Sequence, residues 1–187
     1  RRKTVTFDND EFIRPETTTE SLASLRAAFT KDGLVTAGNS SGINDGTASL
    51  VLANSAALEK HKVNPLARII AYGFGGVPPR IMGMGPVPAS EMALERSGLS
   101  VDDLDLVESN EAFAAQACAV SRQLNLDTAR VNPNGGAIAL GHPVGATGAI
   151  IMTKLIHELH RINGRYGMAT MCIGGGQGIS LVIDAKP

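Results

Sequence analysis

Residues 166–183 read YGMATMCIGGGQGISLVI, a stretch that predicts two β-strands joined by a short connection. The runs 166–173 and 178–183 are rich in residues that strands favour, and a glycine-rich link separates them. This link is too short for the crossover that two parallel strands require. The sequence therefore predicts an antiparallel pair at the end of the chain.

Upstream of this pair, strand-like and helix-like segments alternate. Further strands are expected at 48–52, 66–72 and 105–108. Helices are expected within 17–33, 55–61, 88–98, 112–124 and 144–162. The glycine-rich stretches 73–76 and 82–86 are expected to be loops. Because the strands lack polar alternation, we expect an α/β fold with a mixed sheet covered by helices on both faces.

The composition argues against several classes of function. The chain has 17 basic and 18 acidic residues, and 4% of its residues are aromatic. Neither a basic stripe nor an aromatic stacking platform is visible, so nucleic acid is not an expected partner. No apolar run reaches the roughly 20 residues that a membrane-spanning helix needs. A membrane is therefore not an expected partner either.

The opening residues and the cysteines bear on the compartment. The segment up to Pro15 is polar, is expected to be extended and lacks the apolar core of a signal peptide. Because the chain begins without Met, we expect that an upstream part is missing or separate. The two cysteines, Cys118 and Cys172, make no disulfide framework. A reducing, cytoplasmic location is therefore expected.

His142 is the first candidate for chemistry. It lies just before a predicted helix, whose positive end opposes formation of an imidazolium. A neutral imidazole there could act as a base or donate a hydrogen bond to an oxyanion. Alternatively, His142 simply occupies a turn. The flanking Gly141 and Gly145, which allow a ligand to approach the backbone closely, favour the catalytic interpretation.

The two cysteines differ in their surroundings. Cys172 ends an apolar strand and precedes three glycines, where backbone N–H groups could help to ionise a thiol that substrate can reach. The alternative is a small buried hydrophobic residue. Cys118 is expected to be of that second kind, because it lies among alanines on a predicted helix.

Asn110 and Glu111 lie at a predicted strand-to-helix junction. Asn110 could be a helix N-cap, or its carboxamide could position a water or a carbonyl oxygen. Glu111 could bind a ligand group, or only complement the helix dipole. His157 and His160 are expected to lie on a solvated helix face, so no metal site is predicted. No phosphate-binding loop or dinucleotide fingerprint is present, and no cofactor is expected.

Three segments, in this order, resemble the carboxyl-terminal signatures of the thiolase family. They read NEAFA at 110–114, GGAIALGHPVG at 135–145 and CIGGGQG at 172–178. The stretches TAGNSSG at 36–42 and GMGPVP at 83–88 are also similar to thiolase segments. The resemblance covers nearly the whole chain. The residues of these segments are most similar to those of biosynthetic-type acetoacetyl-coenzyme A thiolases.

The resemblance implies an acyltransferase that uses coenzyme A thioesters as substrates. An acyl group passes from a thioester to an enzyme cysteine, and then to the carbanion of acetyl-coenzyme A, or the reverse. His142 would activate that cysteine and face the thioester oxygen, and Asn110 would hold a water in the same oxyanion hole. Cys172 would exchange the proton at the carbon beside the thioester, and the N–H of Gly174 would contribute to a second oxyanion hole.

The resemblance also implies residues that bind substrate. Ser41 would contact the pantetheine arm, Phe113 would line its tunnel, and Glu111 would hydrogen-bond a neighbouring ligand group. The nucleophilic cysteine of the family lies in an amino-terminal segment that this chain lacks. Loss of a nucleophile can cost on the order of 10⁶ in turnover. We therefore expect the chain to be inactive alone and to need an amino-terminal thiolase half, within a homo-oligomer of the complete enzyme.

The same resemblance implies an αβαβα layering about a five-stranded mixed sheet. Residues 1–43 would end the coenzyme-binding loop region, 44–64 would end the amino-terminal domain, and 65–187 would form the carboxyl-terminal domain. An isolated half would expose the face that meets its twin domain, so poor solubility is expected.

Two alternatives stay open on the sequence. A condensing enzyme of ketoacyl-synthase type shares much of the chemistry, but its use of acyl-carrier protein would distinguish it. A non-catalytic structural or coenzyme A-binding module derived from a thiolase is the other. A purely structural role does not need a thiol beside three glycines, and this favours the enzyme.

Overall fold

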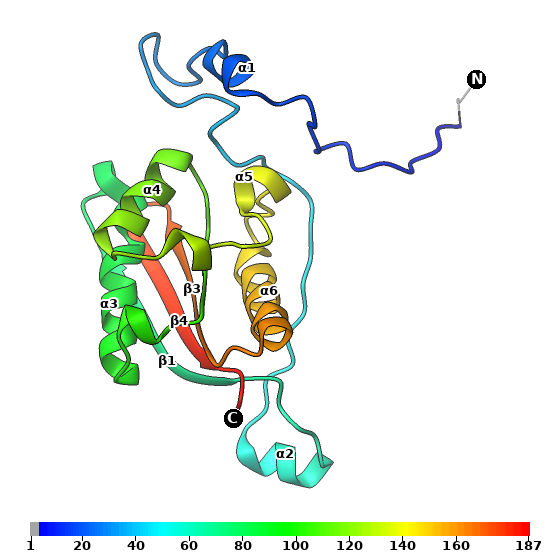
Figure 1. The fold of residues 1–187 in the computed structure, drawn as a ribbon, viewed down its shortest axis with the longest axis vertical. Helices are drawn as coiled ribbons and strands as arrows, with labels where there is room; N and C mark the ends of the chain where they lie inside the picture. The colour runs from blue at the N-terminus through cyan, green and yellow to red at the C-terminus, as the bar shows by residue number, and fades with distance from the viewer. Residues whose placement is uncertain (1–3) are drawn as a thin grey trace.

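The computed structural model describes residues 4–187, so Arg1, Arg2 and Lys3 of the opening segment lie outside it. A four-stranded sheet lies between helices, with α3 and α4 on one face and α6 on the other (Figure 1). The strands are β1 (Arg68–Gly76), β2 (Leu106–Ser109), β3 (Tyr166–Ile173) and β4 (Gln177–Asp184). The α-helices are α1 (Thr19–Ala23), α2 (Ser55–His61), α3 (Pro86–Ser97), α4 (Ala114–Gln123), α5 (Ala137–Leu140) and α6 (Thr147–Ile162). Three short 3₁₀ segments are η1 (Pro79–Met84), η2 (Val101–Asp103) and η3 (Thr128–Arg130).

The sheet is mixed, and its strand order is β1-β4-β3-β2. β3 and β4 are antiparallel, as the short link predicts, and Cys172 lies opposite Gly178. Gly175 and Gly176 turn the chain with φ of 89° and 96°, values that a residue with a side chain rarely adopts. β2 runs parallel to β3, with Ser109 opposite Thr170. The carboxyl ends of β2 and β3 therefore lie side by side.

The sheet has four strands among the described residues and not the expected five, so that detail of the prediction was wrong. Beside β2 only a single bridge forms. Val131 pairs with Val107 in one parallel bridge, and Asn132 N donates to Val107 O at 3.0 Å. Asn132 then adopts φ 47°, and the proline that follows has no N–H to donate. The side chain of Asn132 takes the place of the next backbone pairing. Its Oδ1 accepts from Ser109 N at 2.9 Å, and its Nδ2 donates to Ser109 O at 2.8 Å.

The expected strand at 48–52 was also wrong. This stretch carries no regular secondary structure, and Val51 and Leu52 are 96% and 78% exposed. A strand needs a neighbour for its backbone groups, and residues 4–187 supply none here. The helix expected within 17–33 shrinks to α1, because Ala27 pairs with Thr36 and reverses the chain.

The glycine-rich stretch 73–76 belongs to β1 and not to a loop, so this expectation was also wrong. The physical reason is the close approach of α3 to this strand. A Cβ on Gly73 would collide with the carbonyl oxygen of Ala89, and one on Gly75 would collide with Pro88. The second expected loop, 82–86, is divided between η1 and the first residue of α3.

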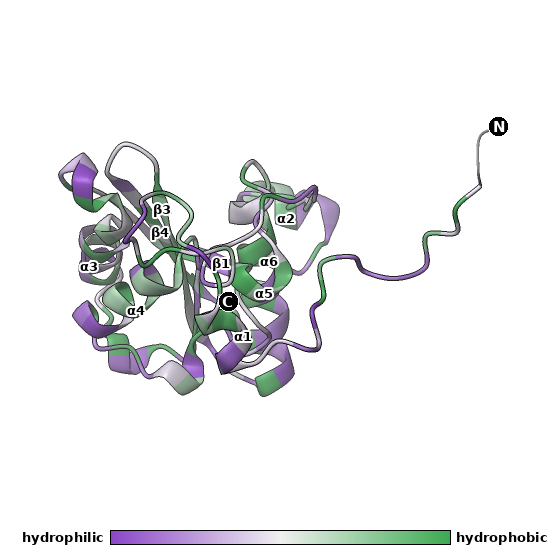
Figure 2. Cartoon of the chain, turned by 90° about the horizontal axis from the view of Figure 1, so that it is seen from above, coloured by the Kyte–Doolittle hydropathy of each residue, from purple (hydrophilic) through white to green (hydrophobic). Residues whose placement is uncertain are grey.

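Two apolar cores lie on opposite faces of the sheet. The first lies beneath α3 and α4 and contains Ala71, Val87, Ala93, Leu94, Leu104, Val107, Val120, Leu124, Leu126, Met168 and Val182. The second lies beneath α6 and contains Leu106, Ile151, Met152, Leu155, Leu159, Ala169, Ile183 and Ala185. Burial of one such leucine stabilises the fold by about 1.5–3 kcal/mol. Coloured by hydropathy, the chain shows the sheet enclosed between the two helical layers (Figure 2).

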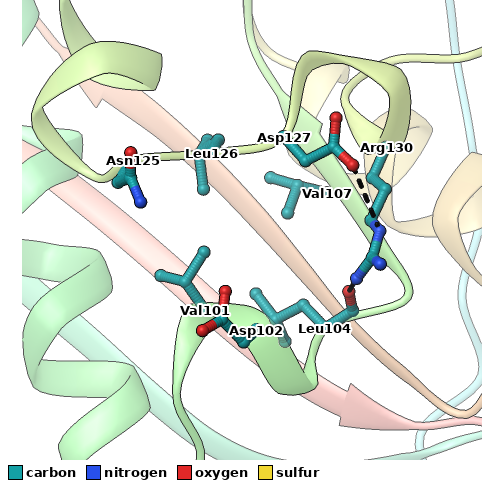
Figure 3. Close-up of a pocket in the computed structure, with 8 residues that line it drawn as sticks. All are labelled: Val101, Asp102, Leu104, Val107, Asn125, Leu126, Asp127 and Arg130. Atoms are coloured by element: carbon teal, nitrogen blue, oxygen red, sulfur yellow. Dashed lines mark hydrogen bonds and ion pairs between the residues drawn. The ribbon is translucent and has the colours of Figure 1, made fainter.

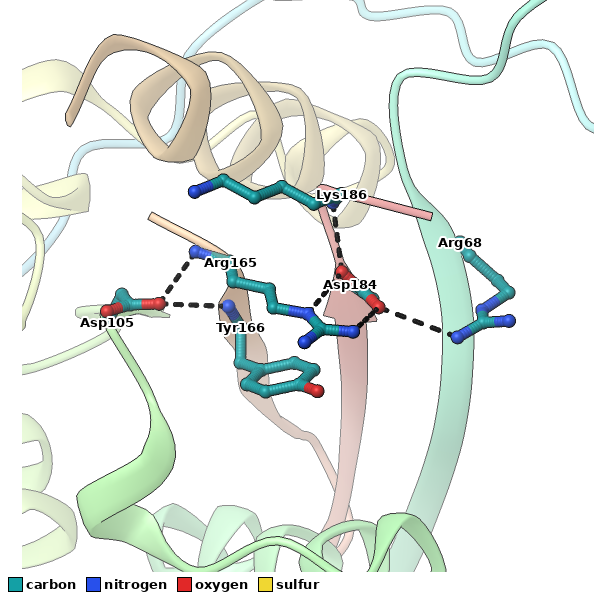
Figure 4. A network of polar contacts seen from close by, with 6 residues as sticks. All are labelled: Arg68, Asp105, Arg165, Tyr166, Asp184 and Lys186. Carbon is teal, nitrogen blue, oxygen red and sulfur yellow. Dashed lines mark hydrogen bonds and ion pairs between the residues drawn. The ribbon is translucent and has the colours of Figure 1, made fainter. Parts of the chain in front are cut away.

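A polar network closes the end of the sheet where β3 begins and β4 ends (Figure 4). The buried carboxylate of Asp184 accepts from Arg165 at 3.1 and 3.2 Å and pairs with Arg68 at 3.5 Å. Burial by itself would raise the pKa of Asp184, but the hydrogen bonds from Arg165 and Lys186 N and the charges of Arg165 and Arg68 together lower it. Among the described residues, no helix combines the length and the apolarity needed to cross a membrane.

Candidate active site

Loop 39–42 joins two of the three signature segments. Ala114 N donates to Asn39 O at 2.9 Å, and both the N–H and the hydroxyl of Ser41 donate to Ala112 O, at 3.1 and 3.2 Å. His142 N in turn donates to Gly42 O at 2.9 Å. Residues about a hundred positions apart are therefore held together by backbone hydrogen bonds.

Asn110 and His142 meet at the carboxyl end of β2. Asn110 continues the ladder beyond β2, because its N–H donates to Thr170 O on β3 at 3.0 Å. Its side chain is buried, and its Nδ2 lies 3.4 Å from His142 Nε2. The sequence placed both residues among the candidates, and the structure brings them into contact.

The environment of His142 keeps the imidazole neutral. The half-buried ring has a pKa below its usual value because burial disfavours the charged form. This is the direction that the sequence predicts. The second ring nitrogen, Nδ1, lies 2.7 Å from the hydroxyl of Thr147 at the start of α6. Both nitrogens of the ring thus have a polar neighbour.

Cys172 lies next to the last residue of β3, two positions beyond the Thr170 that bonds Asn110. Alternation along the strand puts its side chain on the same face as Met168 and Thr170, beneath α3. Burial raises the pKa of the Cys172 thiol, and of the two alternatives left open by the sequence this direction matches the buried residue. The backbone N–H groups expected to help do not offset the loss of solvent. The convergence of Cys172 with His142 stays a prediction.

Gly174 follows this strand end, and Phe113, another predicted site residue, precedes α4. Gly174 is exposed, and a Cβ built on it would meet no atom within 4 Å, so the backbone here is open to a ligand. Phe113 is half-buried and packs edge-on against Phe29, with ring centroids 6.5 Å apart. Cys118, in contrast, is exposed on α4, so its expected burial was wrong.

Glu111 holds the loop that leads to His142. Its carboxylate accepts from Ile138 N at 3.2 Å and from Asn132 Nδ2 at 3.3 Å. Gly136 lies so close that a Cβ there would collide with this carboxylate. The observed partners of Glu111 are therefore protein groups, and its contact with substrate stays a prediction.

Sequence reasoning missed a buried ion pair beside Asn110. Glu108 is 1% exposed at its side chain and accepts from Lys154 Nζ at 2.9 Å. Lys154 Nζ also donates to Gly135 O at 2.6 Å. Burial raises the pKa of Glu108, and Lys154 opposes that shift. The one sequence feature that pointed to this pair was Lys154, which lies among apolar residues of the helix expected at 144–162.

Two cavities lie near β2. One, of about 290 Å³, is bordered by Asn110, Thr147 and the Glu108–Lys154 pair. The other, of about 510 Å³, lies between η2 and η3, and Figure 3 shows its lining. That larger cavity contains none of the predicted site residues. Arg130, one of its lining residues, donates a guanidinium hydrogen bond to Leu104 O at 3.0 Å.

The sequence profiles of two domains match this chain. The profile described as "Thiolase, N-terminal domain" matches residues 1–56, and that described as "Thiolase, C-terminal domain" matches residues 63–185. The chain belongs to the thiolase family. It spans about half the length of the curated thiolases that it matches.

Individual thiolases are similar over nearly the whole chain. The β-ketothiolase BktB of Cupriavidus necator is 56% identical over 185 residues, which are 98% of this chain and 47% of that protein. The crystal structure of Bacillus anthracis acetyl-CoA acetyltransferase superposes with a TM-score of 0.92 at 52% identity, over 98% of this chain and 47% of that one. Human mitochondrial 3-ketoacyl-CoA thiolase in complex with CoA gives 0.87 at 49% identity, over 95% and 45%.

Proposed function

We propose that this chain supplies the carboxyl-terminal part of a thiolase-type acyltransferase. The complete enzyme would condense two molecules of acetyl-coenzyme A to acetoacetyl-coenzyme A, or cleave 3-ketoacyl-coenzyme A by thiolysis. The names of its relatives include acetyl-CoA acetyltransferase and β-ketothiolase, and one solved relative binds CoA. The amino-terminal half, a homo-oligomeric assembly and a cytoplasmic location belong to the same proposal.

In the first step, the thiol of the missing nucleophile would lose its proton to Nε2 of His142. The thiolate would attack the thioester carbonyl, and coenzyme A would leave with the proton that His142 returns. Division of the reaction through an acyl-enzyme makes each half easier. A neutral imidazole is the form that can accept this proton, and burial favours that form here.

In the second step, Cys172 as thiolate would remove a proton from the carbon beside the thioester of acetyl-coenzyme A. The carbanion would attack the acyl-enzyme carbonyl, and the carbon–sulfur bond to the nucleophile would break. The proton taken by Cys172 would then pass to the leaving thiolate and restore both thiols to their starting states. Hydrogen-bond donors near Asn110 and Gly174 would stabilise the oxyanions, and one such donor is worth roughly 10²–10³ in rate. The high pKa of the buried Cys172 thiol makes its thiolate a strong base once it forms.

The contact between Asn110 and His142, at 3.4 Å, carries the proposal. These residues come from two signature segments, and neither needs the other for helix or strand formation. A scaffold that had lost catalysis would not need a carboxamide against a neutral imidazole at an open strand end.

The test is complementation in an acetoacetyl-coenzyme A thiolysis assay. The chain alone should show no cleavage, because neither Cys118 nor Cys172 occupies the place of the family's nucleophile. Co-expression with the amino-terminal part of a thiolase should produce activity. His142→Ala should lower it by about 10²–10⁴. His157→Ala, on the exposed face of α6, is the matched control and should not change it. Robust cleavage by the chain alone would refute the need for a partner.

Calorimetric titration with coenzyme A addresses the non-catalytic alternative. A complemented enzyme should bind coenzyme A and turn over. A coenzyme A-binding module would bind without turnover, and a structural module would do neither. Activity that required an acyl-carrier protein in place of coenzyme A would favour a ketoacyl-synthase type.

A further inference from the structure

We propose that Thr147 is a positioning residue that holds His142 in the Nδ1–H tautomer and thereby leaves Nε2 unprotonated beside Asn110. The inference rests on the proposed function for its purpose, but it concerns groups that this chain contains. Thr147 is the first residue of α6, and it is 3% exposed. Thr147 is not among the site residues chosen from the sequence.

The contacts of the Thr147 hydroxyl are short and lie on two sides. Oγ1 lies 2.7 Å from His142 Nδ1 and 2.9 Å from Pro143 O. A hydroxyl carries one hydrogen, and a carbonyl oxygen can only accept. When Thr147 donates to Pro143 O, it must accept from His142, so Nδ1 carries the proton.

The carboxamide of Asn110 leads to the same tautomer. Its NH₂ group faces Nε2 at 3.4 Å, and an NH₂ group can only donate. Nε2 therefore has to accept, and the ring proton has to lie on Nδ1. The opposite tautomer would place two donors against each other. With the carboxamide in this orientation, one arrangement of hydrogens thus pairs the Asn110 NH₂ group, both ring nitrogens of His142 and the Thr147 hydroxyl.

This tautomer suits the proposed first step. A general base needs a free lone pair on the nitrogen that faces the incoming thiol, and the partner of the other nitrogen decides which one is free. Thr147 lies in the first turn of α6, while the ring belongs to the loop before it. The hydroxyl therefore couples the orientation of the imidazole to a rigid helix.

The opposite arrangement of hydrogens on these three residues is a specific alternative that a measurement can distinguish. Asn110 Oδ1 is buried without a hydrogen-bond partner among the described residues. A turned carboxamide would present Oδ1 to an Nε2–H, and Thr147 would then donate to Nδ1. Pro143 O would keep its bonds from Ala146 N at 2.7 Å and Thr147 N at 2.9 Å. Observation of this arrangement would overturn the proposal.

The test is the ¹⁵N spectrum of the imidazole in the full chain at about pH 8, where the ring is neutral. His142→Gln assigns the signal among the four histidines. We expect the Nδ1–H pattern in the unaltered chain and in Thr147→Ser, which keeps the hydroxyl. Thr147→Val removes the acceptor for Nδ1–H and should shift the ring to Nε2–H, with the Asn110 carboxamide turned so that Oδ1 accepts from it. Thr153→Val is the matched control, because Thr153 on the same helix bonds Ala149 O at 2.8 Å but no histidine.

A dominant Nε2–H form in the unaltered chain, or an unchanged tautomer in Thr147→Val, would sink the inference. The spectrum needs no turnover, so it remains decisive if complementation fails and the proposed function falls. In the complemented enzyme, Thr147→Val should lower kcat about 10- to 100-fold with little change in KM, and Thr147→Ser should restore it. A Thr147→Ser variant as slow as Thr147→Val would contradict the role of the hydroxyl.

Discussion

At the scale of single residues, Glu108 and Lys154 form a buried ion pair next to the candidate site. Glu108 has 1% of its side chain exposed and Lys154 has 22%, so water screens the pair weakly. Removal of one partner leaves an uncompensated charge inside the protein, which costs more than the pair itself contributes.

Lys154→Met should therefore destabilise the chain by on the order of 3 kcal/mol, as measured by urea unfolding. The double variant Glu108→Gln with Lys154→Met should recover most of this loss, because no charge remains buried. Lys60→Met on the exposed α2 is the control for loss of a positive charge. A double variant as unstable as Lys154→Met alone would show that packing, and not charge, is responsible.

Glu158 gives a dependence of stability on pH. Its carboxylate accepts from Arg161 at 2.6 and 2.7 Å, and these bonds lower the pKa of Glu158 to about 2. Because the folded pKa lies below the unfolded one, this contribution is present above about pH 4.5 and is lost as pH falls towards 2. Arg161→Gln should be less stable than the parent chain near pH 6 and should approach it near pH 2. Parallel unfolding curves at both pH values would contradict this assignment.

At the scale of elements, the contact between β1 and α3 explains why glycines occur within a strand. Gly73 lies under α3, where an added Cβ would collide with backbone atoms of Ala89 and Ala93. Gly76 lies at the end of the same strand, where the nearest atom to an added Cβ is Gly176 O at 4.0 Å. Strand composition alone does not distinguish these two glycines.

Gly73→Ala should destabilise the chain by about 1–3 kcal/mol, because the helix must move away from the sheet. Gly76→Ala should be tolerated or slightly stabilising, since it restricts the unfolded chain without a collision. Thermal unfolding of the two variants provides the comparison. Equal losses in both would mean that strand propensity, and not the approach of α3, requires the glycines.

At the scale of the whole molecule, the described chain leaves large apolar side chains in contact with solvent. Ile43 and Val51, in the segment that runs beside α6, are 92% and 96% exposed, and Val144 is 64% exposed (Figure 1). Exposed apolar surface of this kind promotes association.

The isolated chain should therefore associate as its concentration rises, and sedimentation velocity should detect this. The double variant Val51→Glu with Val144→Glu should stay monomeric at concentrations where the parent chain does not. Val63→Glu, at an exposed valine just after α2, is the control. A parent chain that remained monomeric throughout would contradict the prediction.

Sequence reasoning identified much of the fold and chose two candidate site residues that the structure brings into contact. The antiparallel β3–β4 pair followed from the short glycine-rich link, and α2 begins and ends where predicted. Asn110 and His142 were chosen from their motifs and are in contact. These three failures share one cause: the glycine-rich stretch 73–76, the 48–52 stretch and the number of strands in the sheet all depend on which segments pack beside one another.

By itself, the sequence determined which segments could form strands and helices, and which side chains have the chemistry for acyl transfer. These properties are local, since they depend on apolar spacing, caps and residue type. Only the tertiary structure decided that Thr147 and Asn110 lie on either side of His142, and that Lys154 neutralises Glu108. His142 and Thr147 are only five residues apart, but the Asn110–His142 and Glu108–Lys154 pairs join residues 32 and 46 positions apart, and their distances depend on how helices pack against a sheet. Packing is a property of the whole chain, so no local pattern encodes it.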